Sequence, residues 1–450
     1  MPEFFIRSLK MSKFRKQHMP IEWHDVVDTE NIQPAAEATL REKSLLVGRV
    51  GLMMLSVGTA AWRVRASMNK ISRALGIVCV ADIGLLSIEY TCMESGETFT
   101  NALSLSTTGI NTDKLTELEA FTDGFAERAD RYSIEQFHTI LDKFQSMPAN
   151  YKAINLALAA ALACCGFTFL LGGGLVEMIL AFFGAGVGQF VRKKLIERHI
   201  TLLANVTAGV AAACTTYVLL MKAAESLLDV SAVHQAGYIC SMLFIIPGFP
   251  LITGGLDLAK LDIRSGLERI TYAVLIIGMA TLTGAMLAYA FSFHPSEFTE
   301  QAIDDRLKIS FRLIASFCGV YGFSFLYNSK RKMAFTAGLI GMVANTLRLE
   351  LIDFTSIPVP MAAFIGALSS GLLASLIRER TVYPRITLTV PSIVIMVPGM
   401  FMYKAVYYLG NNDMTSASLW LGKAILIVAS LPLGIVFARI FTDKNFRKSS

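Results

Sequence analysis

The chain has 450 residues, of which 54% are hydrophobic and 17% are charged, and its mean hydropathy is +0.52. Soluble proteins carry about 25% charged residues, so this composition excludes an ordinary soluble protein and predicts a polytopic α-helical membrane protein in a lipid bilayer. The formal net charge of +6 predicts no nucleic-acid partner, because basic residues also gather in the cytoplasmic loops of membrane proteins. The seven cysteines include no C-x-x-C pair, so neither a disulfide framework nor a zinc site is expected.

The chain begins with a leader and a domain of mixed secondary structure. Residues 1–35 lack helical or strand periodicity and contain no apolar core long enough for a secretory signal, so we expect a poorly ordered or loosely docked leader. Residues 36–150 are predicted to form a cytoplasmic α/β domain. Its expected elements are one or two helices over 35–75 with a break at Gly58, strands over 77–83, 85–93 and 98–105, and helices that begin near Thr112 and at Ser133.

Ten apolar stretches follow, each near the roughly 20 residues that cross a hydrocarbon core. They are predicted at about 153–171, 174–191, 201–221, 233–253, 270–292, 310–328, 333–351, 355–377, 386–409 and 417–438. They divide into a first five-span unit over 151–292 and a second over 309–440. An extracytoplasmic linker is expected at 293–308, and a basic cytoplasmic tail at 441–450.

The loops between the stretches predict the orientation in the membrane. Lys and Arg gather in alternate loops and after the last stretch, at Arg192, Lys193, Lys194, Arg198, Lys260, Arg264, Arg269, Lys330, Arg331, Lys332, Arg378, Arg380, Arg385, Arg439, Lys444, Arg447 and Lys448. The opposite loops carry few basic residues, and the one at 294–306 is acidic. Because positive loops stay in the cytoplasm, both termini and the α/β domain are predicted to be cytoplasmic, in a cell membrane.

The two units contain matching motifs in equivalent spans. Residues 166–170 read GFTFL and residues 322–326 read GFSFL, and a Pro-Gly pair occurs at Pro247 in the fourth span and at Pro398 in the ninth. The offsets are 156 and 151 residues, so the order and spacing of the motifs agree. Since five spans is an odd number, the second unit must enter the membrane from the opposite side. This predicts two inverted five-helix repeats, as in many secondary transporters.

The Pro-Gly pairs interrupt two apolar runs, SMLFIIPGFPLITGG at 241–255 and VPSIVIMVPGMFMYK at 390–404. Proline removes an amide donor and glycine relaxes the backbone, so polar backbone groups are freed that hydrocarbon cannot satisfy. Broken-helix ends suit the ammonium and carboxylate of a zwitterion, which predicts a substrate site; the alternative is that each proline only kinks a packed span. The residues expected to bind substrate are Pro247, Gly248, Thr253, Ser392, Pro398, Gly399 and Tyr403.

Charged residues in or beside the spans are candidates for proton coupling. A charge at membrane depth costs about 2.5–3.5 kcal/mol on insertion scales, so such residues tend to pair or to serve transport. Glu177 and Asp257 are the candidates, with snorkelling to the interface as the alternative. The sequence has no nucleophile elbow and no H-E-x-x-H motif, so no catalytic residue, metal or cofactor is expected. A channel or receptor gated by the α/β domain is the main alternative to a transporter.

Five stretches carry a family resemblance. They are SVGTAAWRVRASMNKISRALGI at 56–77, TTGINTDKLTELEAF at 107–121, LALAAALACCGFTFLLGGG at 156–174, IIPGFPLITGGLDLAKLDIRSGLER at 245–269 and TVPSIVIMVPGMFMYKAV at 389–406. In this order they resemble the threonine/serine exporter family. The family pattern places an arginine directly before the aspartate after the first Pro-Gly, and here Leu256 precedes Asp257.

The resemblance implies a fused two-module exporter of small hydroxylated amino acids, driven by the proton gradient. Relatives split into two chains are associated with a dicarboxylate instead, so export of a dicarboxylate stays open. The expected partners are therefore a small-molecule substrate, protons and the lipid bilayer, and a homo-oligomer remains possible.

Overall fold

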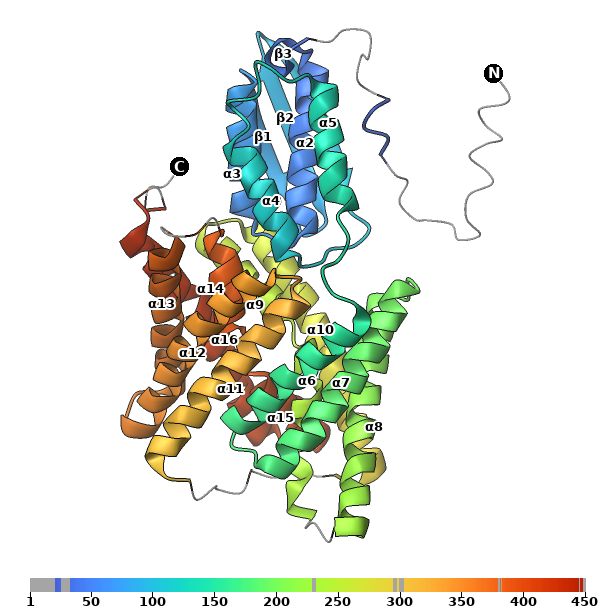
Figure 1. The fold of residues 1–450 in the computed structure, drawn as a ribbon, viewed down its shortest axis with the longest axis vertical. Helices are drawn as coiled ribbons and strands as arrows, with labels where there is room; N and C mark the ends of the chain where they lie inside the picture. The colour runs from blue at the N-terminus through green and yellow to red at the C-terminus, as the bar shows by residue number, and fades with distance from the viewer. Residues whose placement is uncertain are drawn as a thin grey trace, which may run out of the picture.

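The computed structural model describes residues 21–25, 33–228, 232–293, 298, 303–378, 381, 383–444 and 446–447. It places a mixed α/β domain at one end of a larger helical bundle (Figure 1). Most of the predicted leader, much of the predicted linker and the last three residues lie outside the described part of the chain.

The α/β domain has the elements that the sequence predicts. They are η1 (Ala35–Glu37), α2 (Leu40–Ser56), α3 (Ala61–Ala74), β1 (Val78–Ile83), β2 (Ser87–Glu94), β3 (Glu97–Ser104), α4 (Thr112–Asp123) and α5 (Ile134–Ser146). The predicted helix break falls at Gly58, whose φ is +87°. Ser95 and Gly96 have φ of 50° and 88°, values that a two-residue hairpin turn requires, and they join β2 to β3.

Three layers build this domain. The antiparallel sheet has the order β1-β2-β3, α2 and α3 cover one of its faces, and α4 and α5 pack on α2 (Figure 1). Ile88 and Tyr90 alternate along β2 and are buried, and Gly48 of α2 leaves room for the Tyr90 ring, since a Cβ there would clash with it. On the other face, Val78 and Val80 are 61% exposed. The core therefore lies between the sheet and the helices.

Part of the predicted leader contacts this domain. Trp23 is buried, its ring stacks on the His138 ring with 6.1 Å between centroids, and the Arg49 guanidinium lies 5.4 Å from the indole centroid. The His24 ring bonds to the Asp142 carboxylate at 2.7 Å. This short segment is thus held against α5.

The remaining chain is helical. Its elements are α6 (Ala153–Leu170), α7 (Leu175–Glu197), α8 (Leu202–Leu228), η2 (Ala232–Ile245), α9 (Gly248–Ala259), α10 (Ile263–Phe291), α11 (Asp305–Leu326), α12 (Arg331–Phe354), α13 (Val359–Arg378), α14 (Arg385–Val394), α15 (Gly399–Gly410) and α16 (Met414–Thr442). Over the described ranges, eight helices are long and apolar enough to cross a membrane, or up to ten spans if the bent pairs η2–α9 and α14–α15 each count as one. The chain is a polytopic α-helical membrane protein, as predicted.

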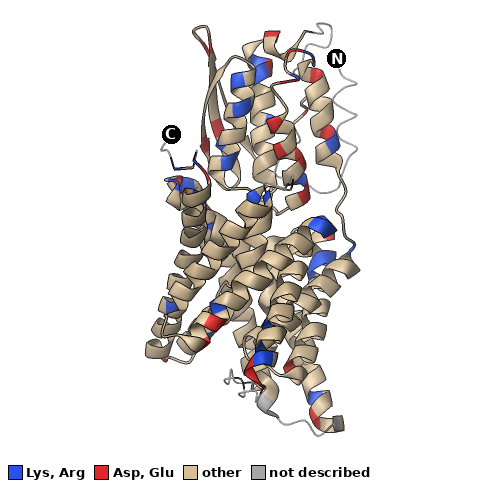
Figure 2. Cartoon of the chain, turned by 60° about the vertical axis from the view of Figure 1, so that its left-hand side comes forward, with Lys and Arg blue, Asp and Glu red and all other residues tan. Residues whose placement is uncertain are grey.

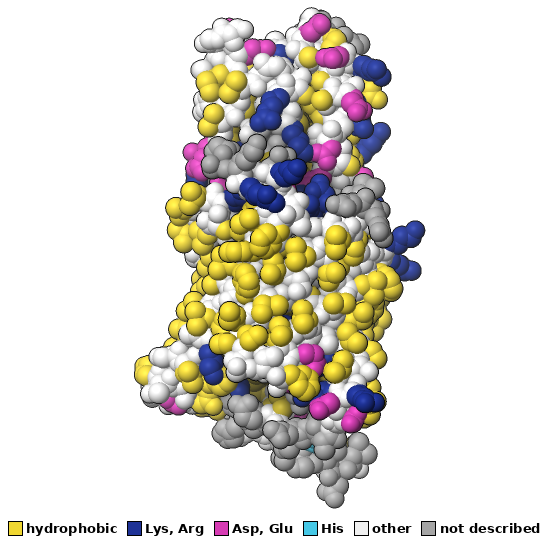
Figure 3. Space-filling model, turned by 90° about the vertical axis from the view of Figure 1, so that its left-hand side faces the viewer, with side chains coloured by type: hydrophobic (Ala, Val, Ile, Leu, Met, Phe, Trp, Pro, Cys, Tyr) yellow, Lys and Arg dark blue, Asp and Glu magenta, His cyan; other side chains and the backbone are white. Residues whose placement is uncertain are grey.

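The surface of the bundle carries the apolar band that lipid requires. Figure 3 shows hydrophobic side chains over the middle of the bundle, and Lys and Arg side chains gathered along the edge where the α/β domain begins. Figure 2 shows the same division in another view, with charged residues on the α/β domain and toward the two ends of the bundle. Large apolar side chains of the bundle helices are exposed, among them Phe183 of α7, Leu219 of α8 and Met286 of α10.

Two successive groups of helices pack in the same order. In the first group α6, α7, α8 and α10 pack around the bent pair η2–α9, and in the second α11, α12, α13 and α16 pack around α14–α15. The groups meet where α6 contacts α11. A short helix of each group also packs against a long helix of the other group: α9 packs on α16, and α15 packs on α10.

The α/β domain is anchored to both groups. Arg65 of α3 forms an ion pair with Asp262, in the turn before α10, at 2.6 Å. The amide of Thr112, at the start of α4, donates to the carbonyl of Tyr327, at the end of α11, at 3.0 Å. The domain therefore bridges the α9–α10 and α11–α12 turns.

Candidate substrate site

Both interrupted spans break in the same way. Pro247 has φ −81° and ψ 62°, and Pro398 has φ −82° and ψ 56°. The amides of Gly248 and Gly399 donate to the carbonyl two residues earlier, at 2.8 Å in the first break and 2.9 Å in the second. These are inverse γ-turns centred on proline, whose ring fixes φ near the required value. The helix axes bend by 58° and 48° at the two turns.

Each break brings the end of one short helix to the start of another. At such a point the last carbonyls of η2 or α14, which carry partial negative charge, lie beside the first amides of α9 or α15, which carry partial positive charge. The two breaks thus offer both signs of charge without a charged side chain.

The two breaks pack against each other reciprocally. A Cβ added to Gly248 would clash with Val394, and a Cβ added to Gly399 would lie 2.9 Å from a methyl carbon of Leu243. Gly399 follows Gly248 by 151 residues, and Val394 follows Leu243 by the same number. Each glycine therefore contacts the same equivalent position in the opposite break. Only glycine permits this close approach.

The contact between α6 and α11 is reciprocal as well. A Cβ on Gly166 would lie 2.6 Å from the carbonyl oxygen of Ala315, and a Cβ on Gly322 would clash with the carbonyl oxygen of Ala159. Gly322 follows Gly166 by 156 residues, and Ala315 follows Ala159 by the same number. The glycine of each motif therefore packs on the part of the other helix that precedes the other motif, and the Phe167 and Phe323 rings contact each other with 5.7 Å between centroids.

A small apolar cavity remains between the breaks and this crossing. It is lined by Phe167, Leu243, Ile246, Phe323, Val394, Val397 and Gly399, and its volume is about 10 Å³. This volume is close to the minimum for one water molecule, so the space is too small for an amino acid. In this structure the two breaks are therefore packed too closely for an amino acid to lie between them.

Thr253 and Ser392 lie near the breaks, but in this state they face their own helices. The Thr253 hydroxyl donates to the carbonyl of Phe249 at 3.0 Å. The Ser392 hydroxyl donates to the Leu388 carbonyl and accepts from the Ser370 hydroxyl at 3.1 Å. Both side chains are buried, and neither lines the small cavity.

Tyr403 links the two groups of helices. Its hydroxyl bonds to the hydroxyl of Tyr238, so α15 of the second group is tied to η2 of the first. The Tyr403 ring also stacks on the Tyr407 ring, with 6.1 Å between centroids. Sequence reasoning did not select Tyr238, although its position nine residues before the first proline, within an apolar run, was a usable signal.

Glu177 is buried in the first turn of α7, which begins at the end of the bundle away from the α/β domain (Figure 1). One carboxylate oxygen accepts from the amide of Gly174 at 2.9 Å, and the other contacts Nδ1 of His234 at 2.7 Å. A carboxylate joined to an imidazole can hold a proton between them. No group of three or more His, Cys, Asp or Glu side chains suited to a metal ion occurs in the part of the chain that the structure describes.

Asp257 lies on α9 in a buried network that reaches the α/β domain. Its carboxylate accepts from the amide of Ala61, at the start of α3, at 2.9 Å and from the hydroxyl of Ser265 at 3.0 Å. It also pairs with Arg269 at 3.1 Å. Arg269 further donates to the carbonyls of the two residues before the α3 N-cap, at 3.4 and 2.7 Å. Asp257 is thus held by α10 and α3 together. Because Leu256 stands where the family pattern has an arginine, Asp257 forms its ion pair with Arg269 instead.

The paired breaks within a multi-pass helical bundle define a membrane transporter. One family model, described as "Putative threonine/serine exporter", matches residues 45–292, and a second, described as "Threonine/Serine exporter, ThrE", matches residues 312–441. The chain therefore belongs to the threonine/serine exporter family, as the sequence motifs predict.

Curated relatives cover different shares of the chain. A threonine/serine exporter of Corynebacterium glutamicum is 22% identical over 410 residues, which is 87% of this chain and 80% of that protein. A probable threonine/serine exporter of Mycobacterium tuberculosis is 23% identical over 88% of this chain and 75% of that protein. The probable succinate transporter subunit YjjP of Escherichia coli is 28% identical over 53% of this chain and 90% of that protein. No solved structure gives a significant match.

Proposed function

We propose that the chain is a secondary active exporter that moves threonine or serine out of the cytoplasm across the cell membrane, driven by the proton gradient. The observation that carries the proposal is the reciprocal contact of the two proline breaks. A span that is only kinked by proline needs no matching partner, whereas a site between two modules draws backbone groups from both.

Two inverted five-span repeats account for the reciprocal contacts. Around a two-fold axis, if residue i of one copy touches residue j of the other, then j also touches i. The glycine contacts between α6 and α11, and those between the breaks, follow this rule at offsets of 156 and 151 residues. This pattern supports a pseudo-two-fold axis that passes through the small cavity, between the breaks.

The breaks suit a small zwitterion. The amides at the start of α9 and α15 attract a carboxylate, and the carbonyls at the end of η2 and α14 attract an ammonium group. Within the described residues, the lining of the small cavity carries no charged side chain. A substrate without net charge therefore enters at lower desolvation cost than a dianion.

The α/β domain and both ends of the chain are proposed to lie in the cytoplasm. Figure 3 supports this orientation, because Lys and Arg side chains gather along the edge of the apolar band next to the α/β domain. In this orientation the substrate enters from the side of the α/β domain and leaves at the far end of the bundle.

The pair of Glu177 and His234 is the proposed site of proton coupling. Glu177 is buried and the His234 side chain is 26% exposed, at the far end of the bundle where protons enter under an inward gradient, and His234 belongs to the broken span. A proton that enters or leaves the pair changes its net charge, and because His234 lies on η2 this change acts on the broken span. Asp257 is the second candidate, with a fixed network around it that favours anchoring the α/β domain.

A small dicarboxylate is the second candidate substrate. Its support is the similarity of about half of the chain to a probable succinate transporter subunit. The uncharged lining of the small cavity favours the amino acid, since two carboxylates would need two compensating cations.

Transport by purified protein in liposomes tests the proposal. We expect labelled threonine or serine to accumulate in the lumen when the lumen is acidic, and we expect an uncoupler to abolish the accumulation. Unlabelled succinate in excess should not compete. Movement that only equilibrates the amino acid would indicate a channel. Movement of succinate without the amino acid would show that the substrate is the dicarboxylate.

A further inference from the structure

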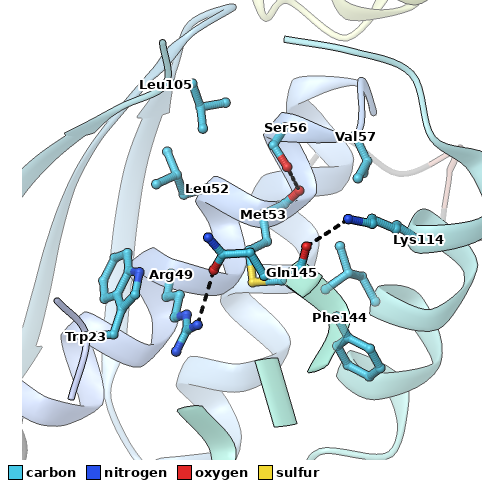
Figure 4. Close-up of a pocket in the computed structure, with 11 residues that line it drawn as sticks. Trp23, Arg49, Leu52, Met53, Ser56, Val57, Leu105, Lys114, Phe144 and Gln145 are labelled. Atoms are coloured by element: carbon cyan, nitrogen blue, oxygen red, sulfur yellow. Dashed lines mark hydrogen bonds between the residues drawn. The ribbon is translucent and has the colours of Figure 1, made fainter. Parts of the chain in front are cut away.

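The α/β domain contains a second cavity, separate from the paired breaks. It lies between α2, α4 and α5, and its volume is about 160 Å³ (Figure 4). This is on the order of ten times the space that one water molecule needs, yet it is below the roughly 300–1,000 Å³ of pockets for drug-sized ligands. The cavity therefore suits a small metabolite.

Two cationic side chains border this cavity. Arg49 of α2 is 1% exposed, and for its Nε, a buried donor, the described part of the chain offers no acceptor. Lys114 of α4 donates to the carbonyl of Gln145 at 3.0 Å, as Figure 4 shows, and it forms no ion pair with any described residue. Burial lowers the pKa of the Lys114 ammonium. Its charge is thus partly desolvated, and no side chain in the described ranges forms an ion pair with it.

The nearby carboxylate does not neutralise Lys114. Asp142 of α5 pairs with Arg49 through one oxygen and contacts the His24 ring at 2.7 Å through the other. The described side chains therefore leave one cationic charge at the cavity uncompensated. An anion that enters can form a charge-assisted hydrogen bond there without displacing an existing ion pair.

We propose that this cavity binds a small carboxylate from the cytoplasm and regulates transport. The carboxylate lies at the Lys114 ammonium, beside the Arg49 guanidinium. The carbon chain packs against Leu52 and Phe144, and the indole of Trp23 lies beside the ligand, because all of these side chains line the cavity (Figure 4). Amino acids and small dicarboxylates share this chemistry.

The cavity connects to the broken span through the end of α2. Val57 lines the cavity, and the carbonyls of the next two residues accept hydrogen bonds from Arg269 at 3.4 and 2.7 Å. The amide of Ala61 donates to Asp257, which lies on α9 after the first break. If the end of α2 can take two positions and the ligand binds more tightly to one of them, the ligand favours that position and, through these contacts, shifts α9. This consequence rests on the proposed exporter function, whereas the binding does not.

Fluorescence of Trp23 in the full-length protein, in lipid nanodiscs, tests the binding. The wild-type protein and the Trp23→Phe variant are each titrated with L-threonine and, separately, with succinate. The signal of Trp23 is the difference in fluorescence between the two proteins. We expect a saturable change with at least one ligand, and the two arms separate an amino acid from a dicarboxylate. Lys114→Gln should weaken binding at least tenfold. Lys143→Gln, at an exposed position of α5 outside the cavity, should leave it unchanged.

Three results overturn the proposal. The first is the absence of a saturable Trp23 signal with both ligands, and the second is equal affinity in wild type and Lys114→Gln. Succinamide, which has the shape of succinate without its charges, should give no signal, and binding as tight as that of succinate also overturns it. This comparison needs no variant, so it holds even if Lys114→Gln fails to fold. Because binding is read directly, a failure here is distinct from a failure of transport.

Discussion

The buried ion pair between Asp257 and Arg269 makes a quantitative prediction about stability. Asp257→Asn keeps the shape of the side chain and an oxygen for the Ala61 amide, but it leaves the Arg269 guanidinium, which is 2% exposed, without a counter-charge. Breaking a buried pair by removing one partner costs about 3–5 kcal/mol. Because Arg269 keeps its hydrogen bonds to two backbone carbonyls, we expect the lower end, about 3 kcal/mol.

Thermal unfolding of the purified protein measures this loss, with Arg264→Gln as the control. Arg264 also bridges α10 to the α/β domain, but it is 42% exposed and its partner Asp82 is 57% exposed, so its pair is worth only about 0–1 kcal/mol. Asp257→Asn should lower the unfolding temperature clearly more than the control does. Adding Arg269→Met should restore part of the loss, since no unpaired charge remains. Equal unfolding temperatures for Asp257→Asn and Arg264→Gln would refute the reasoning.

Other parts of the molecule make further predictions. Glu177→Gln should abolish transport driven by a pH gradient and leave exchange of labelled for unlabelled threonine near the wild-type rate, because an amide cannot carry the proton; equal loss of both activities would contradict coupling at this residue. Burial lowers the pKa of His138 to about 3, against about 6.5 when unfolded. Between these values the unfolded state binds more protons, so stability falls as the pH drops through this window. Unfolding at pH 7 and pH 5 should show a smaller difference in His138→Gln than in wild type, and an unchanged difference would count against this assignment. Tyr403→Phe removes the hydroxyl partner of Tyr238 and should cost about 1 kcal/mol in thermal unfolding; no loss would show that the bond contributes nothing.

The elements of the fold were predictable because their signals are local. Asn111 and Ser133 cap α4 and α5 with their own side chains, bonded to amides three residues on, and Gly58 breaks the first helical run. The spans follow from length and apolarity, and the Pro-Gly pairs mark the two breaks at Pro247 and Pro398. Each of these features depends on a few neighbouring residues, which a sequence displays directly.

The side chains around the site depend on contacts that are distant in the sequence. Asp257 bonds to Ala61, 196 residues earlier, and to Arg269, which the sequence presents only as one more basic loop residue. The hydroxyl of Thr253 turns back to its own helix, because packing around α9 sets which way each side chain faces. The reciprocal contacts of Gly248 and Gly399 likewise require the positions of both modules. A single sequence gives spacing, but it does not give the rotation of each helix about its axis.

Proton-driven threonine flux in proteoliposomes that contain glycine variants tests the central claim most directly. Gly248→Leu and Gly399→Leu each place a side chain where the opposite break packs, whereas Gly422→Leu on α16 meets open space and serves as the matched control. With equal amounts of inserted protein, we expect no flux from either break variant and wild-type flux from Gly422→Leu. Wild-type flux from both break variants would contradict a substrate site between the paired breaks.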